Sequence, residues 1–493
     1  MGGCLSPKKD SSIMTVFPRV NRQTVSTPPL YPERIVQFGA GNFLRGFTDW
    51  IIQMLNEQTD FASGVVVVKV TPGTYPELEA QDGLFHVTLE GMRNGVFHSE
   101  TKRIDCLQRF VYPYIDFESY RALARQPEVR FLISNTTETG IRYDAQDHLA
   151  DTPATTFPAK LTQFLHERFQ HFEGETARGC IILPTELIVN NGDELRRIVL
   201  QYATQWELSP SFVAWVTEAN LFCNTLVDRI VSGAPTAEQA QALTERIGLE
   251  DRQLVMAEWY HSWVIEAPAR LHDELPVRGT GLGVQIVTDV EPYRQTKVRI
   301  LNGLHTSMLP LACFLGIETV HEAMNHPALK RWIQALVYDE IIPSMSLNQE
   351  ELREFANAVL ERFNNPTLKH RFASIALNTL SKVRVRLIPS IQAYQAQYGT
   401  LPPRLVLALA AIIRFYQGTW NGQPLPIQDE TWVVEWFAQL WQTPMSPAER
   451  AQAVLSNEAL WGENLLNVDG LPHALAEALT RLEAETLLSL LQT

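Results

Sequence analysis

Residues 34–70 have the pattern of a strand, a glycine-rich turn, a helix and a second strand. The apolar run 34–38 leads directly into Gly39 and Gly41, and the second strand, 64–70, is rich in valine. Such a valine run is typical of a strand that is buried on both faces of a parallel sheet. A strand, a glycine-rich turn, a helix and a strand form the opening unit of a dinucleotide-binding fold. The sequence therefore predicts an α/β, Rossmann-like domain at the N-terminal end.

The turn of this unit is a candidate binding site for a cofactor pyrophosphate. Its two glycines let the backbone approach a phosphate closely, and the N-terminus of the next helix supplies free N–H groups. The usual third glycine is expected five residues after the first, but Leu44 stands there. The candidate cofactor-binding residues here are Phe38, Gly39, Ala40, Gly41, Asn42, Phe43 and Arg45.

Two later runs, 129–134 and 179–183, are further candidates for parallel strands, and each ends in polar residues. Ligands of open α/β sheets lie at the carboxyl ends of the strands, so Asn135 and Thr136 are expected to face the cofactor. Ordinary strand-to-loop chemistry is the alternative interpretation. The second strand ends at Lys69 without an acidic residue for the adenosine ribose, which leaves NAD and NADP both open.

Helical periodicity dominates after Asp289, following a last strand candidate at 284–288 and an antiparallel excursion at 85–103. We therefore expect a poorly ordered leader (1–30), a Rossmann-like domain (31–290) and a mostly α-helical substrate and catalytic domain (291–493). The expected helices of the last domain are 318–338, 350–362, 368–382, 403–417, 430–441, 447–456 and 472–491.

Composition excludes several classes of function. A formal net charge of -14 argues against nucleic acid or an anionic membrane as the main partner. The five cysteines are scattered without a C-x-x-C pair, so neither a disulfide framework nor a zinc site is indicated, which fits a reducing cytoplasm. No apolar run approaches the roughly 18 residues that a membrane helix needs.

The segment 297–305 places polar groups on a helix face that should be buried. At helical spacing Lys297, Asn302 and His305 fall within an arc of roughly 140°, together with apolar residues. The segment also carries Gly303, which costs about 1 kcal/mol relative to alanine in a helix. The alternative interpretation is a satisfied buried lysine and an Asn cap between two short helices.

A lysine near the boundary of a nucleotide domain suggests hydride transfer. Desolvation disfavours the ammonium form, so a buried lysine can accept a proton from a hydroxyl or return one to a carbonyl. The nicotinamide cofactor would carry the hydride, while Asn302 and His305 would polarise the carbonyl oxygen. No set of metal ligands accompanies these residues, so no metal is predicted.

These motifs resemble the mannitol dehydrogenase family of long-chain, NAD-dependent polyol dehydrogenases. The spacing Lys297-x4-Asn302-x2-His305 is similar to the catalytic helix of that family, and Gly39-x-Gly41-x-Phe43-x-Arg45 to its nucleotide loop. Residues 81–85 and 224–230 resemble two more family motifs, the second of which includes Asp228 as a cofactor-binding candidate. The resemblance implies NAD as cofactor.

Within the family, residues 31–39, 134–140 and 374–378 are most similar to the members that reduce a keto-uronate. This implies a cytoplasmic enzyme that interconverts D-tagaturonate and D-altronate. Where mannitol-specific members carry an oxyanion-site Asn, this chain has Leu187, preceded by the substrate-binding candidate Glu186. Where they carry a substrate-binding arginine, it has Ser374.

We hypothesise that Lys382, Arg384 and Arg386 supply the missing positive charge and hold the substrate carboxylate. The alternative is a solvated basic helix face. Other activities stay open, namely reduction of fructuronate, oxidation of a neutral polyol such as mannitol, or a non-catalytic NAD-binding sensor that retains the fold. The expected partner is a small keto-uronate or aldonate, and the oligomeric state is open with a monomer favoured.

Overall fold

The fold is seen in a computed structural model, which describes residues 17–26, 29–93, 95–137 and 139–492. The chain divides into two compact units. The first comprises residues up to Leu89, Glu100–Ala257 and His261–Thr288, and the second comprises Glu90–Ser99, Glu258–Tyr260 and Asp289 onward. Residues 1–16 of the predicted leader lie outside the described residues, whereas Val20 is fully buried and its N–H donates to the Glu250 carbonyl at 3.0 Å.

The first unit is built on a six-stranded parallel sheet, which confirms the predicted Rossmann-like fold. The strand order is β5-β2-β1-β6-β7-β8, so β1 lies between β2 and β6. The strands are β1 (Glu33–Phe38), β2 (Gly64–Val68), β5 (Leu107–Val111), β6 (Phe131–Ser134), β7 (Ile181–Pro184) and β8 (Leu221–Phe222). Phe38, at the end of β1, pairs with Val68 on one side and with Ser134 on the other.

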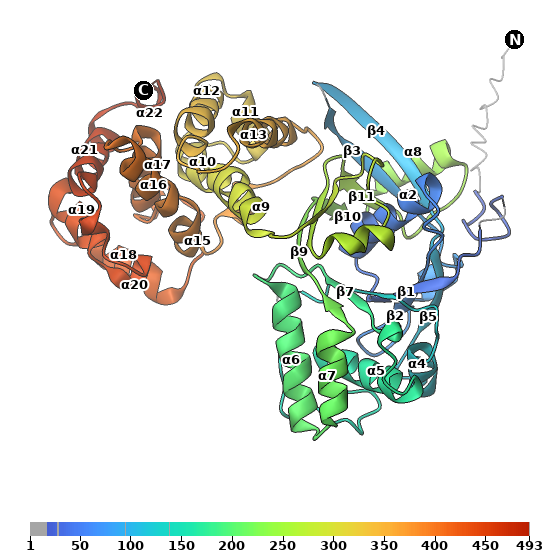
Figure 1. The fold of residues 1–493 in the computed structure, drawn as a ribbon. Helices are drawn as coiled ribbons and strands as arrows, with labels where there is room; N and C mark the ends of the chain where they lie inside the picture. The colour runs from blue at the N-terminus through green and yellow to red at the C-terminus, as the bar shows by residue number, and fades with distance from the viewer. Residues whose placement is uncertain (1–16, 27–28, 94, 138, 493) are drawn as a thin grey trace, which may run out of the picture. The chain divides into compact units, whose positions relative to one another are not determined.

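Helices cover both faces of this sheet (Figure 1). Helices α4 (Phe117–Ala124), α5 (Phe157–His171), α6 (Asn191–Gln205) and α7 (Pro210–Glu218) lie on one side, and α2 (Trp50–Gln58) lies on the other. Valine side chains from β2 are fully buried, as the β-branched run predicts. The remaining helices of the unit are α1 (Asn42–Leu44), the π-helical η1 (Arg45–Asp49), α3 (Pro76–Glu79), the 3-10 helices η2 (Thr176–Arg178) and η3 (Ala269–Asp273), and α8 (Ala237–Ile247).

Strands between residues 85 and 287 also form two smaller sheets. One has the order β10 (Val231–Gly233), β11 (Val255–Glu258), β3 (Phe85–Arg93) and β4 (Val96–Ile104), and the other has β13 (Val284–Val287), β12 (Ser262–Glu266) and β9 (Asn224–Asp228). The pair β3 and β4 forms the expected excursion at 85–103. Strands β11 and β12 were not predicted, because their four or five residues give no clear alternation.

The second unit is mostly helical, as predicted. Its first helical stretch is continuous through α9 (Glu291–Thr296), the π-helical η4 (Lys297–Asn302) and α10 (Gly303–Phe314). The others are α11 (Val320–Asn325), α12 (Pro327–Ala335), η5 (Leu336–Ile341), α13 (Gln349–Phe363), α14 (Phe372–Ile375), α15 (Thr379–Arg386), α16 (Ile388–Tyr398), α17 (Pro403–Phe415), α18 (Thr431–Gln442), α19 (Pro447–Leu455), α20 (Glu458–Trp461), η6 (Leu465–Asn467), α21 (Leu471–Ala484) and α22 (Leu487–Leu490). A short hairpin joins β14 (Thr419–Trp420) to β15 (Gln423–Pro424).

Three of the predicted helices are divided in the structure. The segment 318–338 breaks at His326, whose side chain caps the next helix ahead of Pro327. The segment 368–382 breaks at Asn378, which has a left-handed φ of 50°. The segment 472–491 is interrupted at Thr486, whose side chain caps α22. Within the described residues, no helix is both long and apolar enough to cross a membrane.

Candidate active site

The glycine turn lies at the carboxyl end of β1, where the chain turns into α1. Gly39 has a φ of 103°, which only glycine adopts readily, and its N–H donates to the Val68 carbonyl at 2.8 Å. A Cβ at Gly41 would meet nothing within 4 Å, so the backbone is open to an approaching ligand. At Gly46 a Cβ would come within 2.9 Å of Val231. Gly46 thus permits close packing of its helical turn against Val231 of the smaller sheet.

Arg45 stabilises this turn through hydrogen bonds. Its side chain is only 7% exposed, and it donates to the Ala40 carbonyl at 3.2 Å and to Asn42 Oδ1 at 2.7 Å. It also donates to the carbonyl of Gln253. These hydrogen bonds give Arg45 a positioning role in the turn. Asn42, one of its partners, is exposed.

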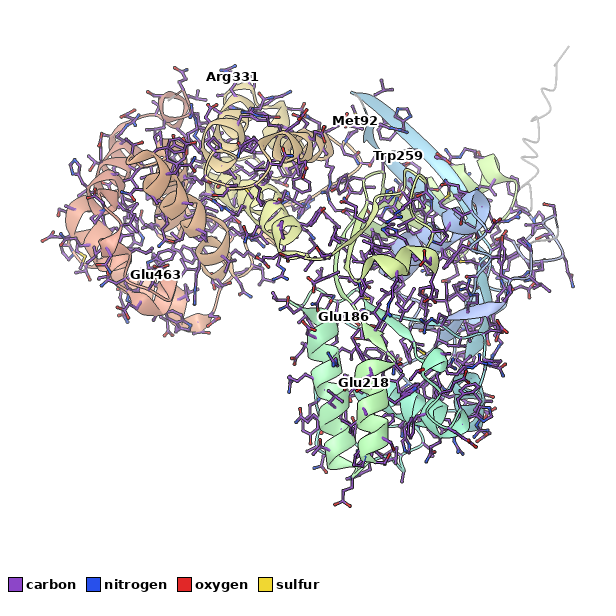
Figure 2. The ribbon with its side chains drawn as sticks, in the orientation of Figure 1. Met92, Glu186, Glu218, Trp259, Arg331 and Glu463 are labelled. Atoms are coloured by element: carbon purple, nitrogen blue, oxygen red, sulfur yellow. The ribbon has the colours of Figure 1, made fainter. Side chains whose placement is uncertain are left out.

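The polar tails of β6 and β7 are joined by one carboxylate. Glu186 is 2% exposed; its Oε1 accepts from the Thr136 N–H at 2.9 Å and its Oε2 from Ser134 Oγ at 3.1 Å. Burial raises the pKa of this carboxyl group. Asn135 donates to the Thr185 carbonyl at 2.9 Å. Glu186 therefore lies with the cofactor candidates, beside the start of α6 (Figure 2), while the neighbouring Leu187 is 63% exposed.

The last cofactor candidate, Asp228, ends β9 in the small three-stranded sheet. Its side chain is buried, and the following residue, Arg229, donates to the Gly46 carbonyl at 2.8 Å. The Arg229 guanidinium also lies over the Trp50 ring at 4.5 Å. These contacts bring the 224–230 motif to the helix that follows the glycine turn.

The predicted catalytic residues lie on the helix of the second unit that runs from Glu291 to Phe314. Its Lys297–Asn302 segment is π-helical, a rare form that is frequent at functional sites. Arg299 holds the opposite side of this segment by donating to Ser390 Oγ at 3.0 Å and to Ser344 Oγ at 2.7 Å. Burial lowers the pKa of Arg299 to about 10.

His305 is buried, whereas Lys297 and Asn302 are half-buried. The expectation that all three are buried is therefore correct only for the histidine. The His305 Nε2 atom has no hydrogen-bond partner among the described residues, and its side chain is 8% exposed. Burial lowers the pKa of His305 well below the usual range, and the charges of Arg362, Arg386 and Lys382 act in the same direction. The imidazole is therefore neutral at neutral pH.

Two of the three basic candidates on α15 lie near His305, and the third does not. Arg386 donates to Thr306 Oγ1 at 3.0 Å, and Lys382 donates to the Ile375 carbonyl at 3.0 Å. Burial lowers the pKa of both residues, to about 10 for Arg386. Arg384 is exposed, and its guanidinium lies against Gly462. Of the three α15 residues, Lys382 and Arg386 thus add positive charge near His305, beside that of Arg362.

Sequence reasoning missed His370 and the group around Arg362. The His370 ring is edge-on to His305 with centroids 4.8 Å apart, and burial and the Arg362 charge lower its pKa. Arg362 pairs with Glu258 through hydrogen bonds of 2.8 and 3.0 Å and lies over the Tyr260 ring at 4.1 Å. Glu258 and Tyr260 come from a segment more than 100 residues earlier in the chain, so helical spacing gave no signal for this group.

Among the described residues, no three His, Cys, Asp or Glu side chains are gathered in a way that would hold a metal ion. The predicted catalytic residues Lys297, Asn302 and His305 offer an amino group, an amide and a neutral imidazole. These groups can move a proton and donate hydrogen bonds to an oxygen atom on which negative charge develops.

Comparison with family models matches both parts of the chain. Residues 33–279 match the mannitol dehydrogenase Rossmann domain, and residues 289–483 match the mannitol dehydrogenase C-terminal domain. The two matches together span most of the 493 residues. They confirm the resemblance seen in the sequence motifs.

Curated relatives extend the similarity over nearly the whole chain. An altronate oxidoreductase of Klebsiella pneumoniae is 46% identical over 450 residues, which are 90% of this chain and 92% of the relative. An altronate oxidoreductase of Escherichia coli is 45% identical over 455 residues, which are 91% of this chain and 94% of the relative.

Solved structures share the fold at lower identity. A substrate-free D-sorbitol dehydrogenase has a TM-score of 0.79 at 22% identity, covering 94% of this chain and 95% of its own. A Pseudomonas fluorescens mannitol 2-dehydrogenase in complex with NAD and D-mannitol has a TM-score of 0.67 at 21% identity, covering 94% of each chain.

Proposed function

The chain belongs to the mannitol dehydrogenase family, and we propose that it is an NAD-dependent oxidoreductase that interconverts D-tagaturonate and D-altronate. The observation that carries the proposal is the neutral His305, with an unpartnered Nε2 and with Arg386 and Lys382 nearby. That combination suits a substrate with both a carbonyl group and a carboxylate. The similarity to altronate oxidoreductases over about nine-tenths of the chain supports this substrate pair.

The cofactor is proposed to bind at the glycine turn of the first unit. The left-handed Gly39, the open backbone at Gly41 and the start of α1 fit a pyrophosphate. When bound, the nicotinamide supplies the hydride for reduction and accepts it for oxidation. Lys69 follows β2 and donates to Thr71 Oγ1 at 3.1 Å. NAD is preferred over NADP because the mannitol 2-dehydrogenase that shares this fold holds NAD.

Lys297 is proposed to move the proton of the reaction. In reduction its ammonium gives a proton to the carbonyl oxygen while the carbonyl carbon gains a hydride, which leaves a secondary alcohol and a neutral amine. In oxidation the amine takes the hydroxyl proton. His305 Nε2 and the Asn302 amide are proposed to hydrogen-bond the same oxygen, where negative charge develops in the transition state.

Lys382 and Arg386 are proposed to hold the substrate carboxylate. The two residues are four apart on α15 and therefore lie on the same helix face. A charged hydrogen bond to a carboxylate contributes roughly 1.5–3 kcal/mol, enough to separate a keto-uronate from a neutral ketose. The same reasoning disfavours mannitol as the physiological substrate. Fructuronate also carries a carboxylate, so its rejection depends on stereochemistry.

A panel of substrates tests the proposal directly. The full chain is mixed with NADH and D-tagaturonate, D-fructuronate or D-fructose, and NADH consumption is followed by absorbance. We expect the highest kcat/KM with D-tagaturonate and the lowest with fructose, and a preference for NADH over NADPH. Equal rates with fructose would refute the carboxylate requirement, and no consumption with any ketone would favour a non-catalytic NAD-binding protein.

A further inference from the structure

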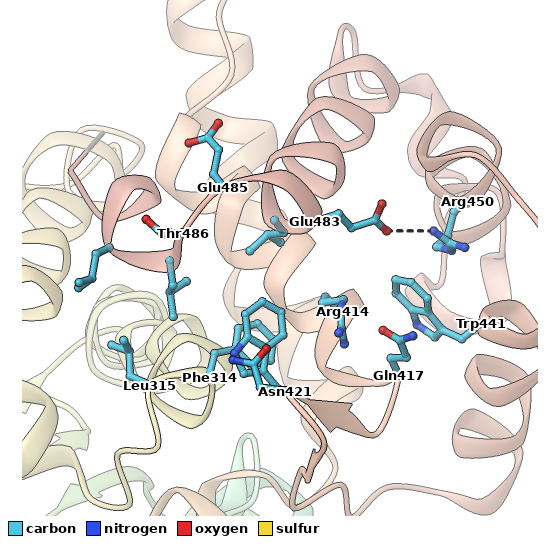
Figure 3. A pocket seen from close by; sticks show the side chains of 14 residues that line it. Phe314, Leu315, Arg414, Gln417, Asn421, Trp441, Arg450, Glu483, Glu485 and Thr486 are labelled. Atoms are coloured by element: carbon cyan, nitrogen blue, oxygen red, sulfur yellow. Dashed lines mark ion pairs between the residues drawn. The ribbon is translucent and has the colours of Figure 1, made fainter.

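The helical unit contains a pocket at the far end of α10 from the catalytic residues. The pocket has a volume of about 750 Å³, within the ~300–1,000 Å³ range of small-molecule sites. Phe314, the last residue of α10, lines it, whereas His305 is near the start of that helix. The two residues are nine positions apart along the helix, or about 13.5 Å at 1.5 Å per residue. We call this cavity the Arg–Trp pocket; Figure 3 shows its lining.

Arg450 gives this pocket an unsatisfied hydrogen-bond donor. The residue is 7% exposed, and its Nε has no hydrogen-bond partner among the described residues. Its guanidinium lies over the Trp441 ring at 4.1 Å, and one terminal nitrogen is 3.6 Å from Glu483 Oε1 (Figure 3). Another terminal nitrogen donates to the Met445 carbonyl at 3.3 Å, so only Nε is left without a partner. A buried donor atom that makes no hydrogen bond is costly, which points to an acceptor that arrives with a ligand.

A second arginine and two tryptophans lie in the same lining. The Arg414 guanidinium is 4.9 Å from the Trp420 ring centroid and 5.6 Å from that of Trp441. Trp420 itself stacks on Phe314, with ring centroids 4.1 Å apart. These contacts hold the arginine side chains in place before a ligand binds, which reduces the entropy lost on binding.

The charges of the lining select the kind of ligand. The two guanidinium groups less the Glu483 carboxylate leave one positive charge, since Glu485, which also lines the pocket, is paired with Arg481 at 2.8 Å. One positive charge complements a monoanion better than a phosphate ester with nearly two negative charges. Gln417 and Asn421 add exposed side-chain amides. Amides and Glu483 can hydrogen-bond hydroxyl groups, and a tryptophan face accepts the C–H face of a sugar.

We propose that the Arg–Trp pocket is a second, non-catalytic binding site for a sugar acid, that is, a polyhydroxylated monocarboxylate. Arg414 and Arg450 bind the carboxylate, the tryptophan rings contact the carbon chain, and the amides and Glu483 bind hydroxyls. This site is separate from the residues proposed for catalysis. Its existence does not depend on which ketone the enzyme reduces.

Calorimetric titration of the full chain with D-gluconate tests the site. We expect a saturable binding component whose dissociation constant rises at least tenfold in Arg414→Gln and in Arg450→Gln. Arg353→Gln is the matched control, because Arg353 also lies over an aromatic ring, Tyr338 at 6.0 Å, outside the pocket. Arg414 is half-buried, so its variant tests the proposal even if Arg450→Gln fails to fold. Turnover of Arg414→Gln without added D-gluconate should match that of the unaltered chain.

Two results would overturn the inference. Gluconate binding that is absent, or that Arg414→Gln leaves unchanged, would show that the pocket is not the site. D-Glucitol or inorganic phosphate binding as tightly as D-gluconate would show that it does not select a monocarboxylate. Any gluconate bound at the active site would still bind to the Arg414→Gln and Arg450→Gln chains. The titrations therefore distinguish failure of the proposed activity from failure of this second site.

Discussion

The Arg386 guanidinium donates a hydrogen bond of 3.0 Å to Thr306 Oγ1, and that hydroxyl donates to the Asn302 carbonyl at 3.0 Å. A proposed carboxylate-binding residue is thereby joined to the helix that carries the proposed catalytic residues. Thr306 is buried, at 1% exposure, and directly follows His305. The positive charge therefore has a fixed place relative to the histidine.

The first prediction concerns the basic residues of α15. Arg386→Gln and Lys382→Gln should each raise KM for D-tagaturonate about 10- to 100-fold, because each removes a charged hydrogen bond of roughly 1.5–3 kcal/mol. Arg384→Gln is the matched control on the same helix and should leave KM unchanged, since its guanidinium lies against Gly462. Steady-state kinetics at fixed NADH measures the effect. Equal shifts in all three variants would instead indicate a general basic surface.

The second prediction concerns Lys297. Lys297→Met should lower kcat about 10²- to 10⁴-fold, the usual contribution of a positioned acid or base, and leave NADH binding intact. Lys330→Met on α12 serves as a control for loss of one lysine. NADH affinity is measured by fluorescence titration and turnover by absorbance. Substantial turnover in Lys297→Met would show that Lys297 is not the proton carrier.

The third prediction concerns the pH dependence of stability. Because the folded state lowers the pKa of His305, protonation favours the unfolded state. The contribution of the neutral His305 side chain to the free energy of unfolding is fully present above the unfolded pKa of about 6.5. It is lost as pH falls below that value, by up to ~1.4 kcal/mol per pH unit.

In His305→Gln, the free energy of unfolding should therefore fall less steeply between about pH 6.5 and pH 5. The slope should decrease by the equivalent of one proton. Urea midpoints at several pH values measure this slope. The control is His473→Gln, which changes an exposed histidine on α21. Parallel slopes in the His305→Gln and unaltered chains would contradict the assigned neutral state.

The fourth prediction concerns the Glu258–Arg362 ion pair, whose side chains are 2% and 6% exposed. Arg362→Met should destabilise the folded chain by about 3–5 kcal/mol, because a buried carboxylate loses its partner. Adding Glu258→Leu should recover part of that loss. The control pair, Arg371–Glu318, has side chains 62% and 71% exposed, and Arg371→Met should cost less than ~1 kcal/mol. Additive losses in the double variant would contradict a specific pairing.

The parallel sheet was predictable because strands such as 64–68, buried on both faces, need continuous β-branched residues. Several helix ends were not, since they depend on single capping side chains such as that of His326. The two-residue offset of Arg384 from Lys382 and Arg386 puts it about 200° around a helix, so its separation was already implied by the spacing. His370, Glu258 and Tyr260 were out of reach, because only the tertiary fold brings them to Arg362 and His305.

The π-helical segment has a consequence for reusing this motif. A π-helical turn contains one more residue than an α-helical turn, and such a turn lies between Lys297 and His305. Copying the spacing Lys-x4-Asn-x2-His onto a regular helix of a designed protein would rotate the lysine away from the histidine, by up to about 100° for one residue of register. A transplant of this chemistry has to carry the backbone distortion together with the Arg299 contacts that hold it.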